Sequence, residues 1–66
     1  MDAVDHRALA VLLTRSLDAL AGAGQTELAC RIAGEACALL RKTDPAAARP
    51  LNAFLHRALL RPRQGN

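Results

Sequence analysis

The sequence predicts a small all-α domain of three antiparallel helices, with the second helix in the centre. Leu and Ala, which lead the helix-propensity scale, dominate its apolar residues, and β-branched residues are scarce. Three segments carry apolar residues at three- to four-residue spacing, and Gly or Pro separates them. We expect one domain over residues 1–61, with helices at about 3–21, 26–42 and 45–61, and a flexible tail at 62–66.

The first helix is expected to pack through leucines that fall on one side at about 100° per residue. These are Leu9, Leu13, Leu17 and Leu20, and Ala8, Leu12 and Ala19 extend the same face. Asp5, near the start, interacts favourably with the helix dipole. The segment Gly22-Ala23-Gly24 is expected to end the helix, because glycine accepts the left-handed conformation of a C-cap.

The second helix is expected to begin at Thr26, a good N-cap residue, with Glu27 in its first turn. Its apolar residues cover more than half of its circumference: Leu28, Ala29, Ile32, Ala33, Ala36, Leu39 and Leu40. A helix with so wide an apolar arc packs on two sides, so it should contact both other helices. Arg31 and Glu35 are expected to face solvent.

The third segment should begin with Asp44 as cap and Pro45 at the first helical position. Pro50 removes a helical hydrogen bond and disfavours helix at the residue before it. Two outcomes stay open: a kink near Pro50, or a short turn at 45–49 followed by a helix from Pro50 to about Leu60. Its apolar stripe is Leu51, Phe54, Leu55, Ala58 and Leu59.

Five large side chains are expected to be among the most buried: Leu13, Leu17, Ile32, Leu39 and Leu55. Two apolar residues are left over, because Val11 and Leu60 lie opposite the packing faces of their helices. Such a surplus favours association with another protein or with a second copy of the chain. The candidate interaction surface is therefore Val11, Leu60, Arg57 and Arg61.

Charge is unevenly distributed along the chain. Residues 1–40 carry three arginines against five carboxylates, whereas residues 41–66 carry six basic residues against Asp44 alone. A basic region of this kind can bind nucleic acid or another anion. The candidate anion-binding residues are Arg41, Lys42, Arg49, Arg57, Arg61 and Arg63. The alternative is a solvated helix face followed by the flexible tail.

Gly24 to Ala29, Ala36 and Asp44-Pro45 together resemble the second half of a tetratricopeptide repeat, over residues of about 16–45. Small residues stand where that family places them, although Asp44-Pro45 comes about one turn late and the aromatic positions of the first helix are absent. The resemblance implies a helical hairpin that binds other proteins. A lone repeat does not form the groove of longer arrays.

Thr26 to Ala29, followed by Gly34 and Arg41-Lys42, is similar to the start of a DNA-binding helix-turn-helix. Gly34 comes one residue later than the turn glycine of that family. The residues that follow, 35–40, are mostly apolar, whereas a recognition helix needs polar side chains that reach base edges. A long second helix that tolerates Gly34 explains the same residues.

Metal binding and catalysis have little support in the sequence. Cys30 and Cys37 stand seven residues apart on one helix, about 10 Å, too far for a mutual disulfide and unlike the closely spaced ligand pairs of zinc sites. Small buried thiols explain them, and a thiol-based redox or metal sensor is the alternative. His6 and His56 lack a carboxylate or nucleophile at helical spacing.

We therefore expect a small helical protein–protein interaction module, an adaptor or regulatory subunit, acting on another protein or as a homodimer. The alternative is a basic helical domain that binds nucleic acid or anions. We expect neither an enzyme nor a metal site, and no cofactor. The longest apolar run, residues 8–13, is too short to span a bilayer, and no signal peptide is evident, so a cytoplasmic location is expected.

Overall fold

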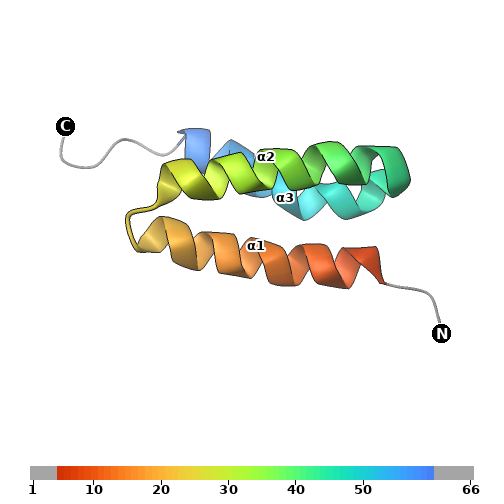
Figure 1. Ribbon diagram of the computed structural model, residues 1–66, viewed down its shortest axis with the longest axis horizontal. Coiled ribbons are helices and arrows are strands. Elements are labelled where there is room, and N and C mark those ends of the chain that lie inside the picture. Colours follow the sequence, from red (N-terminus) through yellow and green to blue (C-terminus); the bar gives the residue numbers. More distant parts are fainter. Residues whose placement is uncertain (1–4, 61–66) are drawn as a thin grey trace.

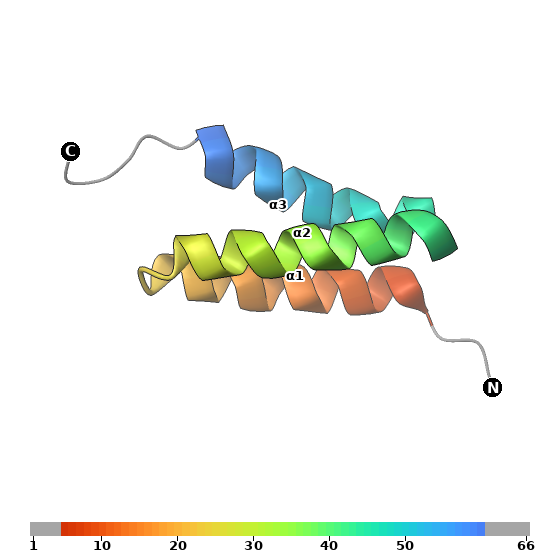
Figure 2. The same ribbon diagram turned by 45° about the horizontal axis from the view of Figure 1, so that its top comes forward.

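The computed structural model describes residues 5–60, which form three α-helices and one short 3₁₀ helix (Figure 1). The elements are α1 (His6–Gly22), α2 (Thr26–Thr43), η1 (Pro45–Ala48) and α3 (Arg49–Leu60). The described residues contain no strand, and α2 contacts both α1 and α3 (Figure 2). The predicted all-α fold with a central second helix is confirmed.

Asp5 caps the start of α1. Its backbone is extended, and its carboxylate Oδ1 accepts hydrogen bonds from the N–H groups of Arg7 and Ala8, both at 3.1 Å. These are two of the four N–H groups that lack a partner at a helix N-terminus. The helix consequently begins at His6, and the predicted start near residue 3 lies outside the described residues.

The turn between α1 and α2 is a Schellman motif. The Gln25 N–H donates to the Leu20 carbonyl and the Gly24 N–H donates to the Ala21 carbonyl, both at 3.0 Å. Gly24 takes the left-handed conformation that this motif requires, with φ of 89°. Thr26 is the first residue of α2 and follows Gln25, which makes no side-chain capping bond, so the prediction of Thr26 as N-cap is wrong.

A single 3₁₀ turn, η1, separates α2 from α3. Pro50 is the second residue of α3, in the first turn, where proline is tolerated far better than in the interior of a helix. Of the two outcomes left open, the structure has the short turn followed by a helix. Asp44 precedes η1 without a side-chain capping bond, and Pro45 occupies the first position of the turn.

The core consists mainly of small side chains. Its buried members are Ala10, Leu17, Ala29, Ala33, Cys37, Ala47, Ala48, Leu51 and Phe54. Thr14 is also buried, and its hydroxyl is satisfied there because it donates to the Ala10 carbonyl at 2.7 Å. Small side chains at the helix contacts allow close approach of the backbones, and Leu17, Leu51 and Phe54 are the large residues buried among them.

The observed set of buried residues therefore differs from the predicted set. Leu17 is buried, and Leu13, Ile32 and Leu55 are half-buried. The prediction for Leu39 is wrong, because this side chain is 68% exposed. The inner face of α2 centres on Ala29, Ala33 and Cys37, which leaves the larger residues of the same apolar arc at its edge. Arg31 and Glu35 are exposed, as expected.

Two further expectations about packing faces are wrong in part. On α1, the face turned to the core contains Ala10, Thr14 and Leu17, and the exposed fractions of Leu9 and Leu12 are 55% and 53%. On α3, Leu51 and Phe54 are buried, but Leu59 is exposed. In both helices, the contact lies to one side of the predicted stripe.

Candidate interaction surface

An apolar surface runs along the hairpin of α1 and α2. Exposed leucines line it from both helices, and half-buried residues between them belong to the edge of the core. We name this surface the leucine seam. Its exposed members are Leu9, Leu12, Leu28 and Leu39, and its half-buried members are Leu13, Leu20, Ile32 and Ala36.

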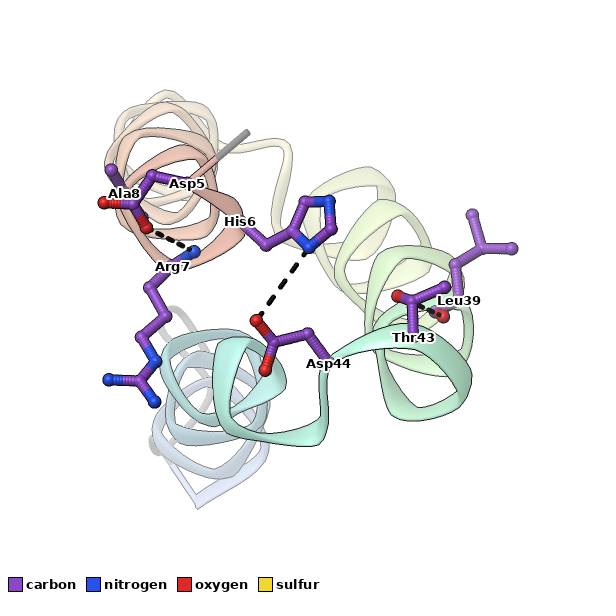
Figure 3. A network of polar contacts seen from close by, with 7 residues as sticks. All are labelled: Asp5, His6, Arg7, Ala8, Leu39, Thr43 and Asp44. Carbon is purple, nitrogen blue, oxygen red and sulfur yellow. Dashed lines mark hydrogen bonds and ion pairs between the residues drawn. The ribbon is translucent and has the colours of Figure 1, made fainter. Parts of the chain in front are cut away.

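Helical periodicity places these residues on one side of the hairpin. At about 100° per residue, Leu28, Ile32 and Leu39 lie within about 40° of one another on α2, and Leu9 lies within about 60° of Leu12 on α1. The opposite edge of α1 contacts α3, where Asp18 pairs with Arg57. Figure 3 shows the Leu39 side chain pointing away from η1 and α3. The leucine seam therefore lies on the side of the hairpin away from α3.

Because α1 and α2 are antiparallel, seam residues of the two helices lie at matching positions along the axis of the hairpin, which we call levels. The Gln25–Leu20 hydrogen bond fixes one end of the hairpin. Residues equally distant from the turn then lie side by side, so Leu20 is level with Leu28 and Leu9 is level with Leu39. At the other end, His6 Nδ1 lies 3.8 Å from Asp44 Oδ2, just beyond the end of α2 (Figure 3). Apolar residues thus face each other at both ends of the hairpin, whereas between them Leu13 is level with Glu35 and Ser16 is level with Ile32.

The residues predicted as an interaction surface do not converge. Val11 is 44% exposed near the start of α1, in a depression of about 350 Å³ that it lines with Arg7, Ala46, Arg49 and Pro50. Leu60 is 71% exposed at the end of α3, close to the opposite end of the domain. Arg57 lies one turn before it, and Arg61 lies outside the described residues.

Arg57 and Asp18 form an ion pair between α3 and α1, with Nη2 3.4 Å from Oδ1 and both side chains about half exposed. Beside them is a shallow depression of about 240 Å³, lined by residues that include Thr26 and Phe54. An exposed pair contributes at most about 1 kcal/mol to stability. Its main effect is to neutralise one of the predicted anion-binding residues.

The other predicted anion-binding residues are spread over the molecule. Arg41 and Lys42 lie in the last turn of α2, where they interact favourably with the helix dipole. Arg49 begins α3, eight residues and about 12 Å before Arg57 along the helix axis. Arg63, like Arg61, lies outside the described residues.

The two cysteines are free thiols in different environments. Cys37 is buried in the core and Cys30 is half-buried. Among residues 5–60, no three His, Cys, Asp or Glu side chains come close enough together to hold a metal ion. None of the helices within residues 5–60 is long and apolar enough to cross a membrane.

Comparison of the chain with protein-family models, with curated proteins and with solved structures gives no match. The leucine seam is therefore defined by the geometry of the chain alone. The sequence contained its members, but helical periodicity assigned them to the core. One signal in the sequence could have identified the seam. α1 and α2 carry more large apolar side chains than a small core built on alanines can bury.

Proposed function

We propose that this protein is a protein–protein interaction module without catalytic activity, an adaptor or regulatory subunit that binds a helical partner through the leucine seam. The observation that supports the proposal is the exposure of four leucines on one side of the α1–α2 hairpin, between 41% and 68% each. Single exposed leucines are common on protein surfaces, but contiguous apolar patches mark interaction sites.

The energetics favour a bound partner. The exposed parts of Leu9, Leu12, Leu28 and Leu39 together equal about two whole leucine side chains. Burying a leucine fully is worth about 1.5–3 kcal/mol. The gain for the seam is thus comparable to the whole stability of a marginal domain, which is about 5 kcal/mol. A partner that covers the seam would stabilise the fold as it binds.

The resemblance of residues 16–45 to a tetratricopeptide repeat implies the same class of function, and it stays a prediction. The α1–α2 hairpin would be the corresponding unit. For this chain the partner would bind one face of a single hairpin, since a lone repeat has no groove.

Nucleic-acid or anion binding is the alternative, and it has less support. Arg57 is already paired with Asp18, and α2 runs without interruption through Gly34, where a helix-turn-helix would need a turn. Arg7 and Arg49 line one depression, which is the feature that most favours an anion.

Site-specific photo-crosslinking in cells that naturally produce the protein tests the proposal. A photoreactive amino acid at Leu12 places the probe on the leucine seam, whereas one at His56 places it on the outer, exposed face of α3. We expect a discrete crosslinked product from position 12 and none from position 56. Equal, diffuse labelling at both positions would show that the seam binds nothing specific.

A further inference from the structure

We propose that the depression between α1 and the start of α3 is a binding site for a phosphate monoester. It is lined by Arg7 and Val11 from α1, by Ala46 from η1, and by Arg49 and Pro50 from α3. The leucine seam lies on the side of the hairpin away from α3. The site therefore goes beyond the proposed function and does not depend on it.

Two arginines from different helices line this depression. Arg7 is the second residue of α1 and Arg49 is the first residue of α3. Figure 3 shows the Arg7 side chain extending from α1 beside the ribbon of η1 and α3. Both arginines are exposed, so their guanidinium groups can turn toward an anion without any change in the core. A phosphate group offers three oxygens, so it can accept hydrogen bonds from both guanidinium groups at once.

The charges around the depression leave it basic. Its lining residues include no carboxylate, and neither arginine forms an ion pair within residues 5–60. The two carboxylates at this end of the domain have other contacts, since Asp5 caps α1 and Asp44 lies 3.8 Å from His6. Against these two carboxylates, residues 5–9 and 40–50 carry four permanently basic side chains: Arg7, Arg41, Lys42 and Arg49. An anion at this end of the domain meets an excess of positive charge.

Both arginines also occupy positions that are unfavourable for a basic residue. Each lies in the first turn of its helix, near the positive end of the helix dipole, whereas Arg41 and Lys42 lie in the favoured last turn of α2. Departures from such local rules are typical of functional positions. An anion bound between the two guanidinium groups would offset the unfavourable charge at both positions.

The lining residues favour a phosphate monoester over other anions. Its phosphate carries about 1.5 to 2 negative charges at pH 7, which matches two arginines, whereas a carboxylate carries one. Val11 and Pro50 are the apolar part of the lining and would contact the organic group of the ester. The volume of about 350 Å³ lies within the range of sites for small molecules, which is about 300–1,000 Å³.

The second depression between α1 and α3 supplies a matched control. It also contains an arginine of α3, Arg57, but Asp18 Oδ1 lies 3.4 Å from its Nη2. An anion there would have to compete with the carboxylate. Arg57→Gln therefore removes the same charge from the same helix, at a depression that should not bind a phosphate.

Titration of the isotope-labelled full chain with phenyl phosphate, followed by NMR, tests the inference. The ionic strength is held at about 0.2 M, where attraction between distant exposed charges is largely screened. We expect saturable amide shifts that are largest at Arg7, Val11 and Arg49. R7Q and R49Q should each weaken binding by about tenfold, because each removes charge-assisted hydrogen bonds, and R57Q should bind like the wild type. Benzoate, with a ring but a single charge, should bind about tenfold more weakly than phenyl phosphate.

The absence of saturable shifts up to about 20 mM phenyl phosphate, a concentration that fills a millimolar site, would overturn the inference. Equal weakening by R57Q, or equal binding of benzoate, would also overturn it, because the attraction would then be unspecific. Circular dichroism of each variant shows that it is folded.

A peptide with one phosphoserine, compared with its unphosphorylated form, distinguishes the two sources of a phosphate monoester. Tighter binding of the phosphopeptide than of phenyl phosphate would support the site and assign it to a phosphorylated protein. If phenyl phosphate binds at least as tightly as the phosphopeptide, the result supports the site and assigns it to a small organic phosphate.

Discussion

Leucines on this molecule differ in what they stabilise, according to the side of the helix that they occupy. Leu51 is fully buried in the core, whereas Leu60, on the same helix, is 71% exposed. Replacing Leu51 with Ala leaves a cavity that the rigid helix contacts cannot close. The same replacement at Leu60 removes atoms that already contact solvent.

We expect Leu51→Ala to lower the free energy of unfolding by about 2–5 kcal/mol, enough to unfold much of the population of a marginal domain. Leu60→Ala should change it by about 0.5 kcal/mol or less. Urea denaturation followed by circular dichroism measures both. Equal effects of the two substitutions would contradict the assignment of Leu51 to the core.

The sequence indicated which residues of each helix are apolar, but not always which of them face the core. Leu17 was predicted correctly, although at about 100° per residue it lies at one edge of the predicted face of α1, on the side where the contact is found. Leu39 was not, because an arc wider than half a turn leaves the direction of the contact undetermined. The alanines decide it, since close backbone approach along Ala29 and Ala33 outweighs the burial of larger side chains at the edge.

At the scale of the elements, two glycines have opposite expected effects. Gly24 has φ of 89°, a conformation that costs an L-residue about 1–2 kcal/mol. Gly34 lies inside α2, and a Cβ built there meets no atom within 4 Å. An alanine at position 34 therefore fits the helix without displacing a neighbour.

Gly24→Ala should lower the free energy of unfolding by about 1–2 kcal/mol, and Gly34→Ala should raise it by about 0.5–1 kcal/mol. Thermal unfolding of both variants beside the wild type is the measurement, and the two midpoints should move in opposite directions. A destabilising Gly34→Ala would mean that α2 is interrupted there, as a helix-turn-helix requires.

The turns between elements were predictable where the backbone conformation of the turn requires one particular residue type. Gly24, directly after the C-cap of α1, is such a case, because only glycine takes the left-handed conformation at little cost. The start of α2 at Thr26 was also predicted, but its N-cap residue was not, because the cap is Gln25, a residue that makes no side-chain capping bond. Pro50 left two outcomes open, since proline is accepted in the first turn of a helix and disfavoured in its interior.

At the scale of the whole molecule, the distribution of charge gives a measurement that separates protein binding from nucleic-acid binding. We expect only weak association with generic duplex DNA, detectable at low ionic strength and lost by about 0.2 M salt. Arg57→Ala should reduce it less than Arg41→Ala, because Asp18 already neutralises Arg57. Fluorescence anisotropy with a labelled duplex at several salt concentrations measures both. A complex that survives about 0.2 M salt and depends on Arg57 would favour the alternative function.

The overall architecture followed from composition and periodicity, because three helices joined by short loops have few ways to bury their apolar faces. The candidate site did not follow in the same way. A surface that a partner covers carries the same residue types as a core, so periodicity alone cannot separate the two. Only the packing of α1 against α2 showed which leucines remained outside.

The single aromatic ring of the chain, other than the two histidines, is that of Phe54, and it is 2% exposed between α3 and α1. Without Trp or Tyr, the folding of this protein cannot be followed by intrinsic tryptophan fluorescence. In proton NMR spectra, however, the lone buried ring acts as a local magnetic label. The methyl groups of Ala21 and Ala58, which line the same depression as Phe54, lie near its ring current. A displaced resonance of Ala21, which is on α1, would report whether α1 and α3 are docked, and Ala58, on the same helix as Phe54, serves as the internal reference.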